Sequence, residues 1–142
     1  MMYPTIMGRF NDYYKKDIPK LLQQWINYDF NYGNYIGDSY ETQEMRLFIR
    51  DFKKVLIKLI APEYEIVEYH KNYYYVSAVL KRKEDSQLIY LSVPDLRYCK
   101  NGWINNILIK TMKHKKDLTG GMNHYADLPC LKEKLNLLKG DK

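Results

Sequence analysis

Two histidines flank a glycine-containing turn in the last third of the chain. His114 and His124 stand on either side of residues 117–123, which read DLTGGMN. One imidazole could accept the 2′-hydroxyl proton of RNA while the other protonates the leaving oxygen, and Asp117 is a third candidate catalytic group. Lys113 could stabilise the charge that develops on the phosphate. The pattern therefore allows a metal-independent ribonuclease. The alternative is that the histidines share a loop without facing each other.

Positive charge is concentrated just before this turn. Residues 97–116 contain six cations and no Asp or Glu, and these six charges equal the net +6 of the whole chain. A local positive field of this kind suits a polyanion or an acidic protein surface. The first of the six, Arg97, is an alternative phosphate-stabilising group for the ribonuclease. The cations are Arg97, Lys100, Lys110, Lys113, Lys115 and Lys116.

The turn itself has the composition of an anion-binding nest. Gly120 and Gly121 permit positive φ values, which lets successive backbone N–H groups converge on one anion. Asp117 and Thr119 could hold the turn by bonding its backbone, and Asn123 adds a side-chain donor. The turn is not a P-loop, because no G-x-x-x-x-G-K-[ST] is present. The alternative is a structural connection between a strand and the last helix.

Tyrosine is unusually frequent, with 15 residues against 4 Phe and 2 Trp. Tyrosines exposed on one face of a sheet, next to lysines, would form a stacking platform for single-stranded nucleic acid. The alternatives are a buried core with ordinary amphipathic edges, and the codon bias of an AT-rich genome. The tyrosines in question are Tyr64, Tyr69, Tyr73, Tyr74, Tyr75 and Tyr90.

Two helices are predicted to precede the strands. Asp17 can cap a helix that has Pro19 in its first turn and runs to about Tyr28. A longer helix begins after Ser39 or Thr42 and stops at Pro62, and its apolar residues recur every three or four positions. The opposite face of this longer helix carries Arg46, Arg50, Lys53, Lys54 and Lys58.

Four strands and a final helix follow. Hairpin turns at 71–72 and 82–86 separate the first three strands, and a helix over 127–138 has Asp127 as its cap. The order α-α-β-β-β-β-α predicts an α+β fold with an antiparallel four-stranded sheet backed by helices. The predicted strands are 64–70, 73–81, 87–93 and 103–111.

Length and composition exclude several classes of protein. The 142 residues suit one globular domain over 1–142. Cys99 and Cys130 form no C-x-x-C pair, so neither a disulfide framework nor a metal site is indicated. Residues 1–10 lack the apolar core of a signal peptide, and no apolar stretch approaches the length of a membrane span. We expect a soluble, cytoplasmic protein without a metal or cofactor.

Three short motifs follow one another in the C-terminal half: LSVPDLR at 91–97, ILIKT at 107–111 after Trp103, and DLTGGMN at 117–123. With these motifs, residues 73–125 resemble small accessory proteins carried by phages, plasmids and conjugative elements of low-GC Gram-positive bacteria. Some mobile-element proteins of this size are anti-CRISPR inhibitors. The resemblance implies one polar site made of Asp95, Arg97, Thr111, Asp117, Thr119, Gly120, Gly121 and Asn123. Lysine at position 110 stands where the pattern has arginine, and it lacks the bidentate fork of arginine.

Three functions are compatible with these patterns. The expected one is an anti-CRISPR-type inhibitor that binds a CRISPR effector nuclease or its guide RNA through residues 97–116 and the adjacent turn. The alternatives are a small ribonuclease that cleaves guide RNA, and a nucleic-acid-binding accessory protein of the element with DNA as its partner. All three place the protein in the cytoplasm of a bacterial host, away from the membrane. A ribonuclease requires catalytic groups that converge around a pocket, whereas a binding protein requires exposed cations or an aromatic patch.

Overall fold

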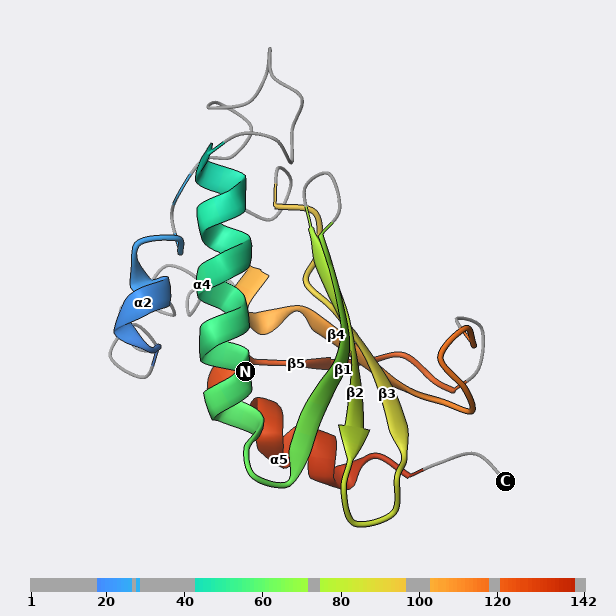
Figure 1. Cartoon of the computed structure of the whole chain (residues 1–142). Coiled ribbons are helices and arrows are strands. Elements are labelled where there is room, and N and C mark those ends of the chain that lie inside the picture. The colour runs from blue at the N-terminus through green and yellow to red at the C-terminus, as the bar shows by residue number, and fades with distance from the viewer. Residues whose placement is uncertain are drawn as a thin grey trace, which may run out of the picture.

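The computed structural model describes residues 18–26, 28, 43–71, 75–96, 103–117 and 121–139. They form the predicted α+β fold, in which an antiparallel sheet packs one face against helices (Figure 1). The sheet has five strands, so the prediction of four is wrong. No helix in the described part of the chain is long and apolar enough to cross a membrane.

Helix α4 (Gln43–Ile60) is the predicted long helix. Its apolar stripe is buried against the sheet, as the spacing of three and four residues requires. The helix ends at Ile60, two residues before Pro62, whose ring cannot continue it. The cationic face points away from the core and is exposed; it carries Arg46, Arg50, Lys53, Lys54 and Lys58.

Helix α2 (Lys20–Gln23) is much shorter than the predicted helix that ends near Tyr28. Pro19, rather than Asp17, occupies its N-cap position. After Gln23 the backbone tightens, because the N–H of Trp25 donates to the carbonyl of Leu22 three residues back. The indole of Trp25, which follows this turn, is buried in the core.

The sheet is a simple meander in which each strand pairs with its neighbours in sequence. The predicted first three strands are confirmed to within a few residues, and a turn at 83–85 separates the second from the third; the predicted turn at 71–72 falls partly outside the described residues. The fifth strand was missed because it has three residues, two of which are exposed. The strands are β1 (Tyr64–Lys71), β2 (Val76–Arg82), β3 (Leu88–Ser92), β4 (Ile107–Met112) and β5 (His124–Ala126).

Two predicted element boundaries in the C-terminal half are wrong. The fourth strand begins at Ile107, and Trp103 starts a short 3-10 helix, η2 (Trp103–Asn105). The reason is a tertiary contact: the Trp103 indole N–H donates to the Trp25 carbonyl at 3.2 Å, and its ring lies 5.1 Å from that of Phe48. The last helix is divided into η3 (Leu128–Cys130), which contains Pro129, and α5 (Leu131–Leu137).

The two faces of the sheet differ in what covers them. Side chains such as Val76, Leu80 and Ile89 face α4 and α5 and form the core. Tyr64 and Tyr69 belong to this inner face: the Tyr64 hydroxyl donates to Asn136 Oδ1 at 2.7 Å, and the Tyr69 hydroxyl donates to the Ile49 carbonyl at 2.8 Å. These two tyrosines are therefore not part of an exposed stacking platform.

The outer face carries a row of side chains from four strands. The register pairs Glu68 with Val79, Val79 with Tyr90, and Tyr90 with Lys110. Val79 and Met112 on this face are buried even though none of the described helices covers it (Figure 1). The segment after β4 leans back over the face, since Lys115 Nζ lies 4.0 Å from Glu68 Oε2 on β1. The outer face is thus the one that the predicted basic segment reaches.

Candidate nucleic-acid interface

Only the last part of the predicted basic segment, residues 113–116, lies with the glycine turn in the connection between β4 and β5. The two strands are antiparallel, with Ile109 opposite His124 and Ile107 opposite Ala126. The connection projects from the sheet on the side away from α2 and α4 (Figure 1). Its described parts are residues 113–117 and 121–123, and together with β4 and β5 they are called the basic hairpin below.

A carboxylate holds the first part of the basic hairpin in a tight turn. Asp117 Oδ2 accepts a hydrogen bond from the Lys113 backbone N–H at 2.9 Å, and the Asp117 N–H donates to the His114 carbonyl at 2.9 Å. Asp117 thus bonds the backbone of residues 113–117, whereas Thr119, its predicted partner in holding the glycine turn, lies outside the described residues. A carboxylate used in this way is a structural group.

The turn presents a cluster of exposed cations. Lys113, Lys115 and Lys116 are all exposed, and His114 lies exposed between them. Lys115 is also within 4.0 Å of Glu68, and Glu68 Oε1 lies 3.0 Å from His70 Nε2. Because Lys115 and Glu68 are both partly exposed, their ion pair holds the turn only loosely toward the sheet. The three lysines therefore remain accessible to an anionic partner.

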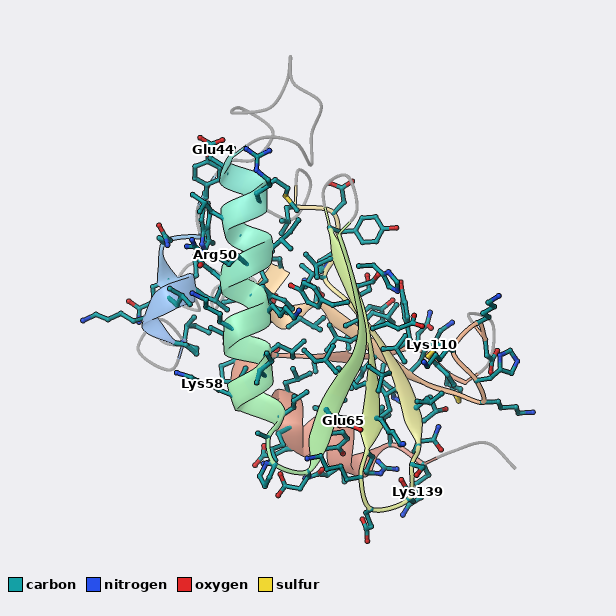
Figure 2. All side chains as sticks on the ribbon, in the orientation of Figure 1. Glu44, Arg50, Lys58, Glu65, Lys110 and Lys139 are labelled. Carbon is teal, nitrogen blue, oxygen red and sulfur yellow. The ribbon has the colours of Figure 1, made fainter. Side chains whose placement is uncertain are left out.

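Lys110 differs from the other predicted cations. Its side chain is on the outer face of central strand β4 and is only 9% exposed. The Nζ atom lies 6.0 Å from the centre of the Tyr90 ring, within cation–π range. Figure 2 shows Lys110 on the side of the sheet away from α4, near the base of the projecting turn. Its position indicates a role in packing rather than in direct contact with a large ligand.

The returning part of the hairpin depends on a glycine. Gly121 has φ +71°, which confirms the positive φ predicted there. A Cβ atom at this position would lie 2.5 Å from the Thr111 carbonyl oxygen and 2.8 Å from Thr111 Oγ1. Only glycine allows so close an approach to β4. The structure therefore brings Gly121 against Thr111, two members of the polar site that the resemblance implies.

A cleft of about 290 Å³ lies beside the turn, between the end of β4 and the β2–β3 connection. Its lining residues are Asp85, Ser86, Gln87, Leu88, Thr111, Met112, Lys113 and Asp117. The Gln87 backbone N–H donates to Asp85 Oδ1 at 3.0 Å, and this bond, helped by Arg82, holds the pKa of the Asp85 carboxyl below its usual value. The cleft thus has an ionised carboxylate at one end and the backbone of the basic turn at the other.

The candidate catalytic residues do not share this cleft. Asp117 lines it, but His114 and His124 are not among its lining residues. His114 is exposed on the turn, whereas His124 is exposed on β5, where it pairs with the inward-facing Ile109. Within the residues that the structure describes, no group of three or more His, Cys, Asp or Glu side chains is placed to hold a metal ion.

Several predicted site residues lie outside the described residues. These are Arg97, Lys100, Thr119 and Gly120, together with Tyr73 and Tyr74 of the proposed stacking platform. Of the described members of the resemblance-based site, Thr111, Asp117 and Gly121 are close to one another around the hairpin. Asn123 is exposed just before β5, and Asp95 follows β3.

Two exposed apolar residues of the basic hairpin were not singled out by sequence reasoning. Met122 is 74% exposed next to Gly121, and Tyr125 is 57% exposed on β5. Tyr125 pairs with Leu108, so its ring is on the outer face, the same side as the turn. If the short strand had been recognised, the alternation of side chains in the sequence HYA would have placed Tyr125 on the face opposite to Ala126.

The chain was also compared with known proteins. It matches no protein-family model, no curated protein and no solved structure. The arrangement of cations and aromatic side chains on the hairpin is therefore the main evidence on function.

Proposed function

We propose that this protein is a non-catalytic inhibitor of the anti-CRISPR type that binds the guide RNA of a CRISPR effector nuclease through the basic hairpin. The observation that carries the binding part is the exposure of Lys113, Lys115 and Lys116 on one turn. Clustered lysines neutralise successive phosphates and release their counterions. The CRISPR part of the proposal rests on the resemblance of residues 73–125 to accessory proteins of mobile elements.

The aromatic residue beside the lysines favours RNA over an acidic protein surface. Tyr125 exposes its ring on the same side of the sheet as the turn. Stacking of an unpaired base on such a ring, next to cations that contact the backbone, is the usual way that proteins hold single-stranded nucleic acid. Guide RNA has single-stranded stretches of this kind, whereas a duplex would offer no free base to Tyr125.

Neither His114 nor His124 is among the described residues that line the cleft beside the turn, and this favours binding over catalysis. Acid–base cleavage needs two groups within hydrogen-bond reach of one phosphodiester. Among the described residues that line the cleft beside the turn, the only titratable groups are Asp85, Lys113 and Asp117. Two carboxylates at that position would repel a phosphate rather than activate it.

The test compares guide RNA alone with guide RNA loaded on an effector nuclease. Labelled RNA is incubated with the wild-type protein and resolved on denaturing and native gels. A triple variant, Lys113→Glu with Lys115→Glu and Lys116→Glu, removes the proposed contact. A matched control, Lys83→Glu with Lys134→Glu and Lys139→Glu, changes exposed lysines elsewhere and lowers the net charge by the same amount.

The expected result is intact RNA together with a shifted or dissociated effector complex. The hairpin triple variant should no longer shift or dissociate the complex, whereas the control variant should act like the wild type. Shortened RNA that disappears in His114→Ala or His124→Ala would instead establish the ribonuclease. A shift with DNA of the element but not with guide RNA would assign the protein to the element's own replication or transfer. Equal loss of binding in both triple variants would mean that total charge, rather than the hairpin, attracts RNA.

A further inference from the structure

A second surface lies on the helical side of the molecule, away from the basic hairpin. A groove of about 520 Å³ runs between α2 and α4. Its floor is aliphatic and includes Leu21, Val55 and Leu59, and lysines stand along its rim. The lining residues are Pro19, Lys20, Leu21, Lys54, Val55, Ile57, Lys58 and Leu59. This combination of an apolar floor and a single sign of charge is the feature that needs an explanation.

The rim charges have no counterpart within the described structure. Lys20, Lys54 and Lys58 are exposed, and among the described residues none of them forms an ion pair. No acidic residue is among the described residues that line the groove. By contrast, the neighbouring groove along β1 has Glu65 and Glu68 among its lining residues beside its lysines. The groove between α2 and α4 is therefore the one that is complementary to negative charge.

Two exposed aliphatic side chains mark where a ligand would be anchored. Leu21 on α2 is 37% exposed and Ile57 on α4 is 48% exposed. Ile57 lines both grooves, so it forms the ridge between them. Side chains of this kind exclude water from an interface when a partner places its own apolar residues on either side.

The walls of the groove are held in place from below. The indole N–H of Trp25 donates to Asp51 Oδ2 at 3.0 Å, which ties the chain after α2 to α4. Asp51 is fully buried, and Arg50 also donates to it at 2.9 Å. A groove with fixed walls loses little conformational entropy when it binds.

We propose that this groove docks an acidic amphipathic segment of a partner protein, with aliphatic or aromatic anchors on its floor and carboxylates against the lysine rim. No aromatic ring lines the groove, so it offers nothing on which a nucleotide base could stack. It is concave, whereas a membrane surface requires apolar side chains that protrude. A helix that lies in a groove with such anchors is a common mode of peptide recognition.

The groove and the basic hairpin are on opposite sides of the sheet. Figure 1 shows α2 and α4 on one side and the β4–β5 connection on the other, and Figure 2 shows Lys58 on the helical side and Lys110 on the hairpin side. An RNA and an acidic protein segment would therefore not compete for space. The protein could bridge the two, and this goes beyond the proposed binding of guide RNA.

The test uses a set of fluorescein-labelled helical peptides with Leu, Ile or Phe at heptad a and d positions and Glu at most others. Fluorescence anisotropy with the full chain measures the dissociation constant. We expect at least one acidic peptide to bind, and Lys54→Glu with Lys58→Glu to weaken it about tenfold or more. Ile57→Glu should have a similar effect. The matched control is Lys134→Glu with Lys139→Glu, two exposed lysines that do not line the groove, which should change nothing.

A charge-swap experiment and mapping make the result specific. Peptides with Lys in place of Glu should bind the Lys54→Glu, Lys58→Glu variant but not the wild type. Amide chemical-shift changes should centre on Leu21, Ile57 and Leu59, and the Lys113, Lys115 and Lys116 reversals should leave peptide binding unchanged. Failure of every acidic peptide, or chemical-shift changes centred on the hairpin, would overturn the proposal. The proposal would also be overturned if Ile57→Glu left peptide binding unchanged and abolished binding to anionic vesicles, binding to RNA, or self-association.

Discussion

Gly121 lies against Thr111 so closely that no side chain fits between them. A Cβ atom on Gly121 would be 2.5 Å from the Thr111 carbonyl oxygen, and the glycine has φ +71°. This backbone contact joins the returning arm of the basic hairpin to the end of β4. The position of β5, and with it Tyr125, depends on it.

The first prediction concerns this contact. Gly121→Ala should lower the free energy of unfolding by about 2 kcal/mol, because alanine disfavours positive φ and would collide with Thr111. RNA binding should fall with it, since the turn would shift. Urea unfolding followed by circular dichroism measures the first effect and gel shift the second. Met122→Ala, at the exposed neighbouring residue, should change the stability little. A Gly121→Ala variant as stable as the wild type would contradict the observed approach.

The second prediction is the salt dependence of RNA binding. If Lys113, Lys115 and Lys116 each neutralise one phosphate, their reversal to Glu should reduce the slope of log K against log salt by about 2, because each contact to a single strand contributes about 0.7. Titrations at several salt concentrations measure the slope for both triple variants. The control variant at Lys83, Lys134 and Lys139 should keep the wild-type slope. If the slope fell as much in the control as in the hairpin variant, a defined hairpin contact would be ruled out.

The third prediction concerns the buried carboxylate of α4. Asp51→Ala should destabilise the fold by about 3 kcal/mol, because it leaves the Trp25 indole N–H buried without its acceptor. Trp25→Phe removes the donor and should also destabilise the protein. In a double-mutant cycle, the two changes should be less than additive, since they break the same hydrogen bond. Additive effects in thermal or urea unfolding would show that the bond contributes nothing.

The fourth prediction concerns the end of α5. The guanidinium of Arg82 on β2 donates to the Leu135 carbonyl at 3.2 Å and to the Leu138 carbonyl at 2.9 and 3.1 Å, and so caps the helix. Arg82→Met keeps the aliphatic stem but loses these bonds, and we expect a loss of about 2 kcal/mol. Lys81→Met, one residue earlier on the opposite face, is the control. The nearby ion pair with Asp85 contributes little, because Asp85 is about half exposed.

The fifth prediction is a loss of stability at alkaline pH. Burial raises the pKa of the Tyr69 hydroxyl well above its ordinary value of 10.0. In the unfolded chain this group ionises near pH 10 while the folded protein keeps its proton. The stabilisation is therefore complete below pH 10 and falls by about 1.4 kcal/mol for each pH unit above it.

Tyr69→Phe tests this origin of the alkaline loss. The variant should lose about 1 kcal/mol at pH 7, with the hydrogen bond to the Ile49 carbonyl, and should decline less steeply above pH 10. Urea unfolding at a series of pH values measures both effects. Tyr125→Phe, at an exposed tyrosine, should leave the profile as in the wild type. An unchanged alkaline slope in Tyr69→Phe would assign the loss to other groups.

The regular elements of the fold could be predicted because their signals are local. The stripe along α4 and the alternation in β1 to β3 follow from side-chain periodicity within each segment. Trp103 and β5 could not be predicted in the same way. Trp103 leaves the strand because of its contacts with Trp25 and Phe48, which are distant in sequence. The strand β5 is defined by its pairing with β4, and three residues carry too little periodicity to reveal it.

The site could be predicted only in outline. Counting charges was enough to locate the cations of 113–116, because lysines in a turn are exposed almost by default. The burial of Lys110 was not apparent, since it depends on the turn leaning over the outer face of β4. Tyr64 and Tyr69 were candidates for stacking on bases, but α4 and α5 cover the face to which they point. Alternation assigns residues to two faces without saying which face the helices cover.

The edges of the sheet have a consequence for solubility. An edge strand offers unpaired N–H and C=O groups to strands of other molecules, and a long flat edge leads to aggregation. In β1 the register shifts between Ile66 and Glu68, and such a bulge twists the strand out of the plane that a second molecule would need. The opposite edge, β5, is only three residues long. Both edges of the described sheet therefore have a feature that disfavours edge-to-edge pairing with a second molecule.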